Sequence, residues 1–183
     1  YEKKEKRNKI IIGVVLIMLM VGSTAGYAVF SIIGGNDEED PNLRGIEFAL
    51  GDDNLWYFNV EGQVFSSVYN PLQTKDVLIN TNITLEDYSQ KPLFFSHDSV
   101  REGIDEIARN IQGNVERTQF VCIDECEENL PLKDCSDNII IIKEGNETLI
   151  KQDGNCIYII GKKEEIIKAS DAFLFKLLDV EYD

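Results

Sequence analysis

The spacing of apolar residues predicts two amphipathic helices in this chain. The first is predicted from an apolar stripe with intervals of four, three, one and three, formed by Val100, Ile104, Ile107, Ala108 and Ile111. Ser99 and Glu102 have the spacing of a capping box at its start, and Gly113 follows its end. A broad apolar face over residues 164–178 predicts the second helix.

Short segments rich in apolar, aromatic and β-branched residues predict the strands. They cover residues 46–50, 56–60, 63–69, 77–83, 93–96, 118–123, 139–143, 148–151 and 156–160. Glu61-Gly62 predicts a tight hairpin turn, and turns at 144–146 and 153–155 predict a meander of the last three strands. The helix between 93–96 and 118–123 favours a parallel pair. We therefore predict an α+β fold, with one mixed sheet and two helices in residues 45–183.

Residues 10–33 form an apolar run of 24 residues without a charged side chain. A helix of this length spans roughly 36 Å, enough to cross a hydrocarbon core of about 30 Å. Residues 1–9 carry five basic and two acidic side chains, and four acidic side chains follow at 37–40. The positive-inside rule therefore predicts a cytoplasmic tail at 1–9, a single-pass transmembrane anchor at 10–33 and an extracellular remainder at the cell membrane.

A cleaved signal peptide is the main alternative to this anchor. Gly26-Tyr27-Ala28 resembles a small-residue cleavage site. The apolar run nevertheless continues to Ile33, whereas signal peptides usually have about 7–15 apolar residues, so an uncleaved signal-anchor is favoured. A pilin-like assembly helix is a third interpretation, although the run lacks the Glu that such helices carry.

Composition and charge narrow the class of protein. Residues 34–44 combine glycine, proline and acidic residues, which predicts a flexible spacer before the domain at 45–183. The whole chain has a net charge of −15, and the first nine residues alone carry +3. The strongly acidic remainder argues against a nucleic-acid partner, because phosphate binding needs a basic face.

All four cysteines lie in the domain that we expect to be exported: Cys122, Cys126, Cys135 and Cys156. In an oxidising compartment, four cysteines predict two disulfide bonds. Three connectivities are possible, and we favour Cys135–Cys156 with Cys122–Cys126. A zinc centre is the alternative, but the C-x3-C-x8-C-x20-C spacing lacks a paired knuckle.

The acidic residues around these cysteines form a second candidate site. They are Asp124, Glu125, Glu127, Glu128, Asp134 and Asp137. A loop closed by a disulfide can hold calcium through carboxylates, but the EF-hand spacing is absent and charge runs are usually solvated. We therefore predict no metal and no cofactor. Asn82 and Asn146 each begin an N-glycosylation triplet, and Asn146 lies in a predicted turn.

The chain has a single histidine, His97, between a predicted strand and the capped helix. A residue at that position can face a crevice at the carboxyl end of a sheet, where α/β proteins bind ligands. A polar turn residue is the simpler interpretation. Because no serine or cysteine has a recognisable base partner in the sequence, we assign no catalytic residue.

The C-terminal third carries a family likeness. Cys135, the strand at 139–142, the stretch 153–161 with Cys156, Lys168-Ala-Ser-Asp171 and the leucines at 174, 177 and 178 carry most of it. With the basic tail and the hairpin, this pattern resembles uncharacterised single-pass proteins predicted from small-genome archaea. That family has no assigned activity, so the resemblance implies an archaeal envelope setting and no functional residues.

Three functions remain open at this point. A non-enzymatic envelope module that binds a partner or glycan, or serves as a subunit of a membrane complex, accords best with the anchor, the spacer and the lack of a catalytic pattern. An exported hydrolase would use His97 with a nearby acid such as Asp98. A filament or surface-layer component would assemble through the anchor helix.

The cysteine prediction has a direct test by mass. Full reduction of the oxidised protein is expected to raise its mass by about four hydrogen atoms, two for each disulfide. Intact-mass spectrometry before and after treatment with a phosphine reductant measures this change. A rise of two hydrogens, or none, would contradict the two-disulfide assignment.

Overall fold

The computed structural model describes residues 45–123, 126 and 129–180. The expected tail, anchor and spacer at 1–9, 10–33 and 34–44 lie outside these residues. Within the described part of the chain, no helix has both the length and the apolar character needed to cross a membrane.

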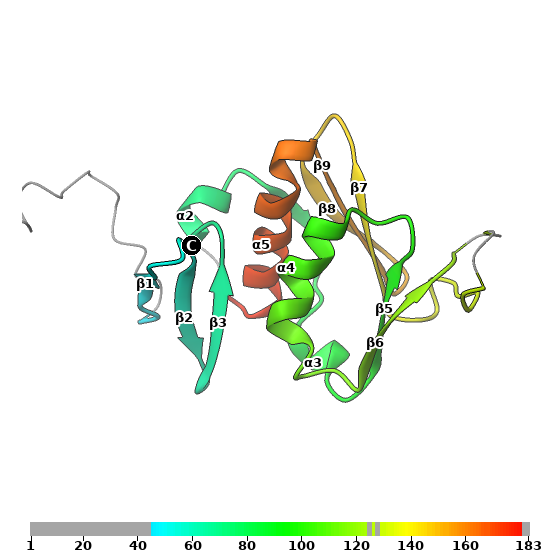
Figure 1. The fold of residues 1–183 in the computed structure, drawn as a ribbon, viewed down its shortest axis with the longest axis horizontal. Coiled ribbons are helices and arrows are strands. Elements are labelled where there is room, and N and C mark those ends of the chain that lie inside the picture. The colour runs from blue at the N-terminus through cyan, green and yellow to red at the C-terminus, as the bar shows by residue number, and fades with distance from the viewer. Residues whose placement is uncertain (1–44, 124–125, 127–128, 181–183) are drawn as a thin grey trace, which may run out of the picture. The chain divides into compact units, whose positions relative to one another are not determined.

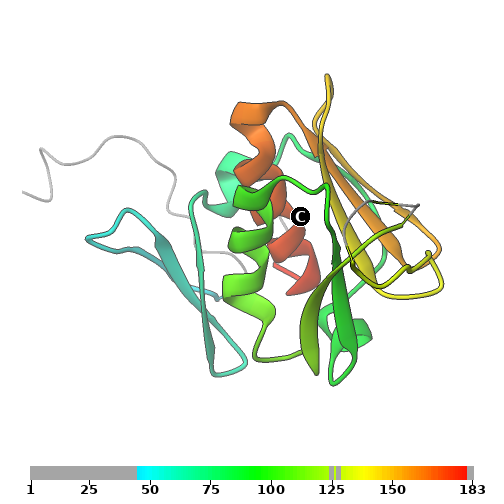
Figure 2. The same ribbon diagram turned by 45° about the vertical axis from the view of Figure 1, so that its right-hand side comes forward.

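The described residues form two sheets with a helical layer between them, as Figures 1 and 2 show. The smaller sheet is antiparallel and has the strand order β1 (Phe48–Leu50), β2 (Trp56–Val60), β3 (Gln63–Ser67). The larger sheet has six strands in the order β4 (Leu78–Asn80), β8 (Leu149–Asp153), β9 (Cys156–Gly161), β7 (Ile139–Glu144), β5 (Pro92–Ser96), β6 (Arg117–Val121).

The larger sheet is mixed. β9, β7, β5 and β6 run parallel to one another, β8 is antiparallel to β9, and β4 is parallel to β8. The helical layer consists of α4 (Arg101–Ile111) and α5 (Ile166–Leu177), the latter preceded by the 3-10 turn η1 (Lys163–Glu165). Two four-residue helices, α2 (Pro71–Thr74) and α3 (Leu85–Tyr88), flank β4 in the sequence.

The α+β class and the mixed sheet are confirmed, but the count of elements differs from the prediction. The described residues form two sheets and four α-helices, rather than one sheet and two helices. The short helices were missed because four residues carry no helical periodicity. α2 begins instead with a capping box between Asn70 and Gln73 and a proline at its first turn.

The predicted meander of the last three strands is wrong. β7 pairs with β9 in parallel, and β8 lies on the far side of β9. The physical reason is burial: Ile139–Ile142 are completely buried on both faces of the sheet, as strands in the middle of a parallel sheet are. A meander would have placed the more polar β8 beside β7 instead.

The predicted capping box at Ser99 is also wrong. α4 begins at Arg101 with Val100 as its N-cap, and that N-cap makes no side-chain hydrogen bond. The Ser99 hydroxyl instead accepts a hydrogen bond from the Ile142 amide at 3.0 Å, and the Val100 amide donates to the Ile142 carbonyl at 2.9 Å. The serine thus ties the start of α4 to β7 rather than capping the helix.

Each face of the six-stranded sheet carries its own apolar cluster. α4 and α5 cover one face, and Ile140, Ile142, Ile157 and Ile159 point into that cluster. The other face carries Phe94, Val121, Ile139, Ile141 and Cys156, with Ile123, Cys135 and Tyr158 packed against them. The segment between β6 and β7 therefore covers the face that the helices leave open.

Polar side chains from the two helices join the smaller sheet to the helical layer. The Asn110 side chain both accepts from the Ser66 amide and donates to the Ser66 carbonyl, each at 2.8 Å. It therefore pairs with the outer edge of β3 much as a further strand would. Asp171 of α5 accepts hydrogen bonds from the Val68 and Tyr69 amides at 3.1 and 2.8 Å.

Asp171 is fully buried beside another carboxyl group. Burial raises the pKa of the Asp171 carboxyl well above its usual range, and the neighbouring Glu106 raises it further by charge and hydrogen bonding. The amides of Tyr69 and Val68 oppose this shift without cancelling it. Glu106 in turn forms an ion pair with Arg109. Asp171 therefore keeps its proton in the folded protein at pH values where the unfolded chain has lost it.

We expect the substitution Asp171→Asn to flatten the pH dependence of stability. Between the unfolded and folded pKa values the unfolded chain binds fewer protons, so Asp171 lowers the free energy of unfolding as pH rises. Asn keeps the acceptor for Val68 and Tyr69 but does not titrate. Urea denaturation at pH 4 and pH 8 should show a smaller loss in the variant than in the natural chain.

The control for this prediction is Asp105→Asn, which removes an exposed carboxylate on the neighbouring helix α4. Its stability should follow the pH dependence of the natural chain. Parallel curves for Asp171→Asn and the natural chain would contradict the assigned protonation of Asp171.

Candidate functional site

His97, which comes immediately after β5, lines a cavity of about 370 Å³. The cavity is lined by Ser96, His97, Asp98, Ile123, Ile141, Lys143 and Tyr158. Ser96 ends β5, and His97 and Asp98 follow it. Ile123 follows β6, and Lys143 lies near the end of β7. Because these three strands are parallel, the cavity opens at their carboxyl ends.

The strand connections explain why a crevice forms there. From β5 the chain passes through α4 to β6 on one side, and from β7 it passes through β8 to β9 on the other side. β5 and β7 are neighbours whose connections leave in opposite directions. Ligand sites of open α/β sheets lie outside the carboxyl ends of such a strand pair.

Backbone hydrogen bonds hold this turn rigidly between its neighbours. The His97 amide donates to the Val121 carbonyl at 2.9 Å, which continues the pairing of β5 with β6 by one residue. On the other side, Ser99 and Val100 bond to Ile142 of β7, as described above. The lining side chains are therefore carried by a backbone that is fixed on both sides.

One carboxylate and one ammonium group dominate the electrostatics of the cavity. The Asp98 carboxylate lies 3.2 Å from the Lys143 ammonium group and accepts a hydrogen bond from the Ser96 hydroxyl. Burial raises the pKa of Asp98, but the hydrogen bonds from Ser96 and Lys143 and the charges of Lys143 and His97 outweigh it, so the net shift is downward. Asp98 is therefore an ionised hydrogen-bond acceptor at neutral pH.

The hydrolase hypothesis required His97 to face a concave pocket with converging carboxylates. His97 does line a cavity, but Asp98 is the single carboxylate among the described lining residues. Its ion pair with Lys143 and its low pKa suit it poorly to donate a proton. Among the described lining residues, Asp98 is therefore the one acid that a hydrolase based on His97 could use.

A disulfide pair adjoins His97. Cys122 and Cys126 are joined, and a His97 ring nitrogen lies within 4.8 Å of both sulfur atoms. In the thiol form these three groups have donor types suited to zinc, but a disulfide offers no thiolate ligands. Cys135 and Cys156 belong to a separate pair, so the four cysteines do not form one zinc centre.

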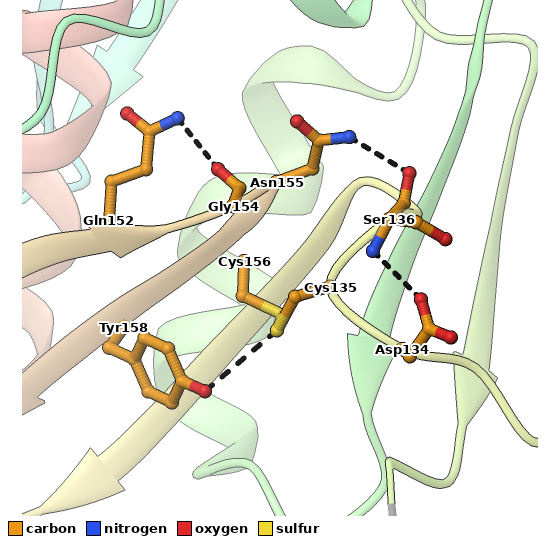
Figure 3. Close-up of a disulfide and its surroundings, with 8 residues drawn as sticks. All are labelled: Asp134, Cys135, Ser136, Gln152, Gly154, Asn155, Cys156 and Tyr158. Atoms are coloured by element: carbon orange, nitrogen blue, oxygen red, sulfur yellow. Dashed lines mark hydrogen bonds between the residues drawn. A yellow bond between two sulfur atoms is a disulfide. The ribbon is translucent and has the colours of Figure 1, made fainter.

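The Cys135–Cys156 disulfide fastens the segment before β7 to the sheet (Figure 3). Its Cα atoms are 4.9 Å apart, within the usual range for a disulfide. The Asn155 amide donates to the Cys135 carbonyl at 2.8 Å, and the Asn155 side chain donates to the Ser136 carbonyl at 2.8 Å. The two disulfides, Cys122–Cys126 and Cys135–Cys156, are the pairings that the sequence analysis favoured.

The remaining candidates lie away from the cavity. Asn82 and Asn146 are both exposed, and their glycosylation stays a prediction. Asp124, Glu125, Glu127 and Glu128 of the predicted calcium loop lie outside the described residues. In the described part, Asp134 accepts from the Ser136 amide and Asp137 from Lys133, and these carboxylates form no metal-binding group.

Sequence reasoning identified His97 and Asp98 but missed Lys143 and Tyr158. Lys143 comes directly after four isoleucines, and a polar residue at the carboxyl end of a buried parallel strand is a recognisable signal. It was missed because the sequence analysis did not place β7 beside β5. Tyr158 gave no signal, since it lies within an apolar strand segment.

Comparison with known proteins does not extend this description. The sequence matches no family model, and no curated protein or solved structure is significantly similar to it. The cavity, the charge pair and the two disulfides are therefore the observations from which function has to be inferred.

We expect Gly154→Ala to destabilise the covered face of the sheet. Gly154 has a positive φ of 58°, and a Cβ placed there would lie 2.7 Å from the Cys135 carbonyl oxygen. Gly62 also has a positive φ, of 86°, but open space around its Cβ position. Gly62→Ala should cost about 1–2 kcal/mol, and Gly154→Ala at least about 1 kcal/mol more.

Urea denaturation with intact disulfides measures both variants. Equal losses for Gly154→Ala and Gly62→Ala would show that the contact with Cys135 contributes nothing beyond the backbone conformation.

Proposed function

We propose that this protein is a membrane-anchored cell-envelope protein whose outer domain is a non-enzymatic binding module. The apolar run at 10–33 would anchor it, with the basic residues 1–9 in the cytoplasm. The spacer at 34–44 would hold the domain clear of the lipid. The observation that carries the binding role is the polar cavity at the carboxyl ends of β5, β6 and β7.

The charges of the cavity favour a neutral ligand. Asp98 and Lys143 compensate one another at 3.2 Å, so the lining has little net charge to attract an ion. An ionised carboxylate accepts hydrogen bonds, and an ammonium group donates them. A hydroxyl group does both, so adjacent hydroxyl groups can bridge this pair.

The other lining residues suit the same ligand class. Tyr158, Ile123 and Ile141 supply an aromatic ring and aliphatic surface, on which the C–H groups of a sugar ring can pack. Ser96 adds a hydroxyl group beside Asp98. A saccharide unit of an envelope glycan combines vicinal hydroxyl groups with such C–H surfaces, and we propose it as the ligand class.

Saccharide binding can be tested on the full chain in micelles of a zwitterionic detergent, since sugar-headed detergents would compete. A panel of neutral monosaccharides and methyl glycosides is observed by saturation-transfer NMR. We expect at least one sugar to receive saturation. Asp98→Asn and Lys143→Gln should each weaken its binding about tenfold or more, because each removes a charged hydrogen-bonding partner.

The matched control is Lys91→Gln, which removes the same charge just before β5, at the opposite end of that strand. It should bind like the natural chain. If no sugar receives saturation, or if all three variants weaken binding equally, the proposed ligand class is wrong. Conversion of a glycoside to free sugar during the experiment would instead support the hydrolase.

A role as a subunit of a membrane complex is compatible with the same module. Crosslinking and affinity purification of the tagged full chain from source membranes would identify such a complex. A stoichiometric partner would support the subunit role, and regular polymers of the chain alone would support the filament hypothesis.

A further inference from the structure

We propose that Cys122–Cys126 is a redox-active disulfide that exchanges with thiols at the His97 cavity, whereas Cys135–Cys156 is structural. This inference adds a thiol–disulfide activity to the proposed binding role and does not depend on it. It rests on the different surroundings of the two disulfides.

The active pair would be held at the edge of the sheet by its buried member. Cys122 directly follows β6 and is 2 % exposed. Its amide donates to the Pro131 carbonyl at 3.0 Å, and its carbonyl accepts from the Lys133 amide at 2.9 Å. Cys126 is half-buried, so a thiolate from solution can approach its sulfur more easily. A buried and an accessible sulfur are the arrangement that directional exchange needs.

His97 distinguishes this pair chemically. It is the single histidine of the chain, and its ring nitrogen lies within 4.8 Å of both sulfur atoms. The pairing of Ser96 with Val121 brings the residues after β5 and β6, His97 and Cys122, side by side. A protonated imidazole stabilises a neighbouring thiolate, and the thiolate is both the nucleophile and the leaving group of exchange.

The second pair has neighbours that suit a structural bond. The Tyr158 hydroxyl lies 4.0 Å from Cys135 Sγ (Figure 3). Cys156 is fully buried in the apolar cluster on that face of the sheet. The backbone of Cys135 is also held by Asn155 and approached closely by Gly154. Exchange there would require the covering segment to move away.

Loop length separates the two disulfides further. Cys135 and Cys156 are 21 residues apart, whereas Cys122 and Cys126 are 4 apart. The stabilisation from a disulfide falls as the closed loop shortens, because less entropy is removed from the unfolded chain. The short disulfide therefore contributes the smaller share of fold stability, and its reduction leaves the sheet and its covering segment in place.

A thiolate of a small thiol or a cysteine-containing peptide attacks Cys126 Sγ, the Cys122–Cys126 bond breaks, and Cys122 leaves as a thiolate. A second thiolate attacks the mixed disulfide at the donor's sulfur and releases Cys126. The donor is oxidised to its disulfide and the protein is reduced by two electrons, with protons exchanged with water. The reverse sequence oxidises a substrate dithiol.

The experiment uses the oxidised full chain in zwitterionic detergent with a metal chelator. It is equilibrated across ratios of reduced to oxidised glutathione, quenched by alkylation and read by peptide mass spectrometry. We expect Cys122 and Cys126 to be alkylated at ratios that leave Cys135 and Cys156 joined. Joint reduction of both pairs, or reduction of Cys122–Cys126 only in denaturant, would overturn the proposal.

The role of His97 is tested by the rate of exchange. His97→Gln and His97→Asn should each slow reduction of the Cys122–Cys126 bond by glutathione about tenfold. Lys91→Gln should react like the natural chain. Unchanged rates in both histidine variants would remove His97 from the mechanism. Sugar binding is read separately, so either proposal can fail alone.

Discussion

The architecture depends on shielding both faces of β7 from water. Four consecutive isoleucines, Ile139–Ile142, lie in the middle of the larger sheet and are completely buried. α4 and α5 cover one face. The other face needs a different cover, and the chain supplies the segment between β6 and β7, fastened by Cys135–Cys156. This cross-link holds irregular backbone, which has no periodic apolar stripe of its own, against a hydrophobic surface.

The candidate site is a consequence of that arrangement. Where the covering segment meets the carboxyl ends of the parallel strands, the described residues line a cavity of about 370 Å³. His97 and Ile123 meet there because they follow neighbouring strands, and Lys143 joins them from β7. Residues that are far apart in the sequence thus form one site through strand register alone.

Local signals in the sequence predicted much of the fold. The Glu61-Gly62 turn, with positive φ at both residues, and the stripe of Ile104, Ile107 and Ile111 gave correct elements. Strand order could not be predicted, because a turn between β7 and β8 does not show which of them pairs with β9. Ser99 shows the same limit: its spacing fits a helix cap, but the nearby amide of Ile142 takes the hydroxyl.

The hydrogen bonds made by the two residues that follow β3 form late during synthesis of this chain. Val68 and Tyr69 find their acceptor in Asp171, which lies 103 and 102 residues later in the sequence. At about 5–20 residues per second, that partner is synthesised roughly 5–20 seconds after the hairpin. During this interval the amides of Val68 and Tyr69, which directly follow β3, lack this acceptor and can pair with other chains. The nascent hairpin is therefore the segment that a chaperone would protect most from pairing with other chains.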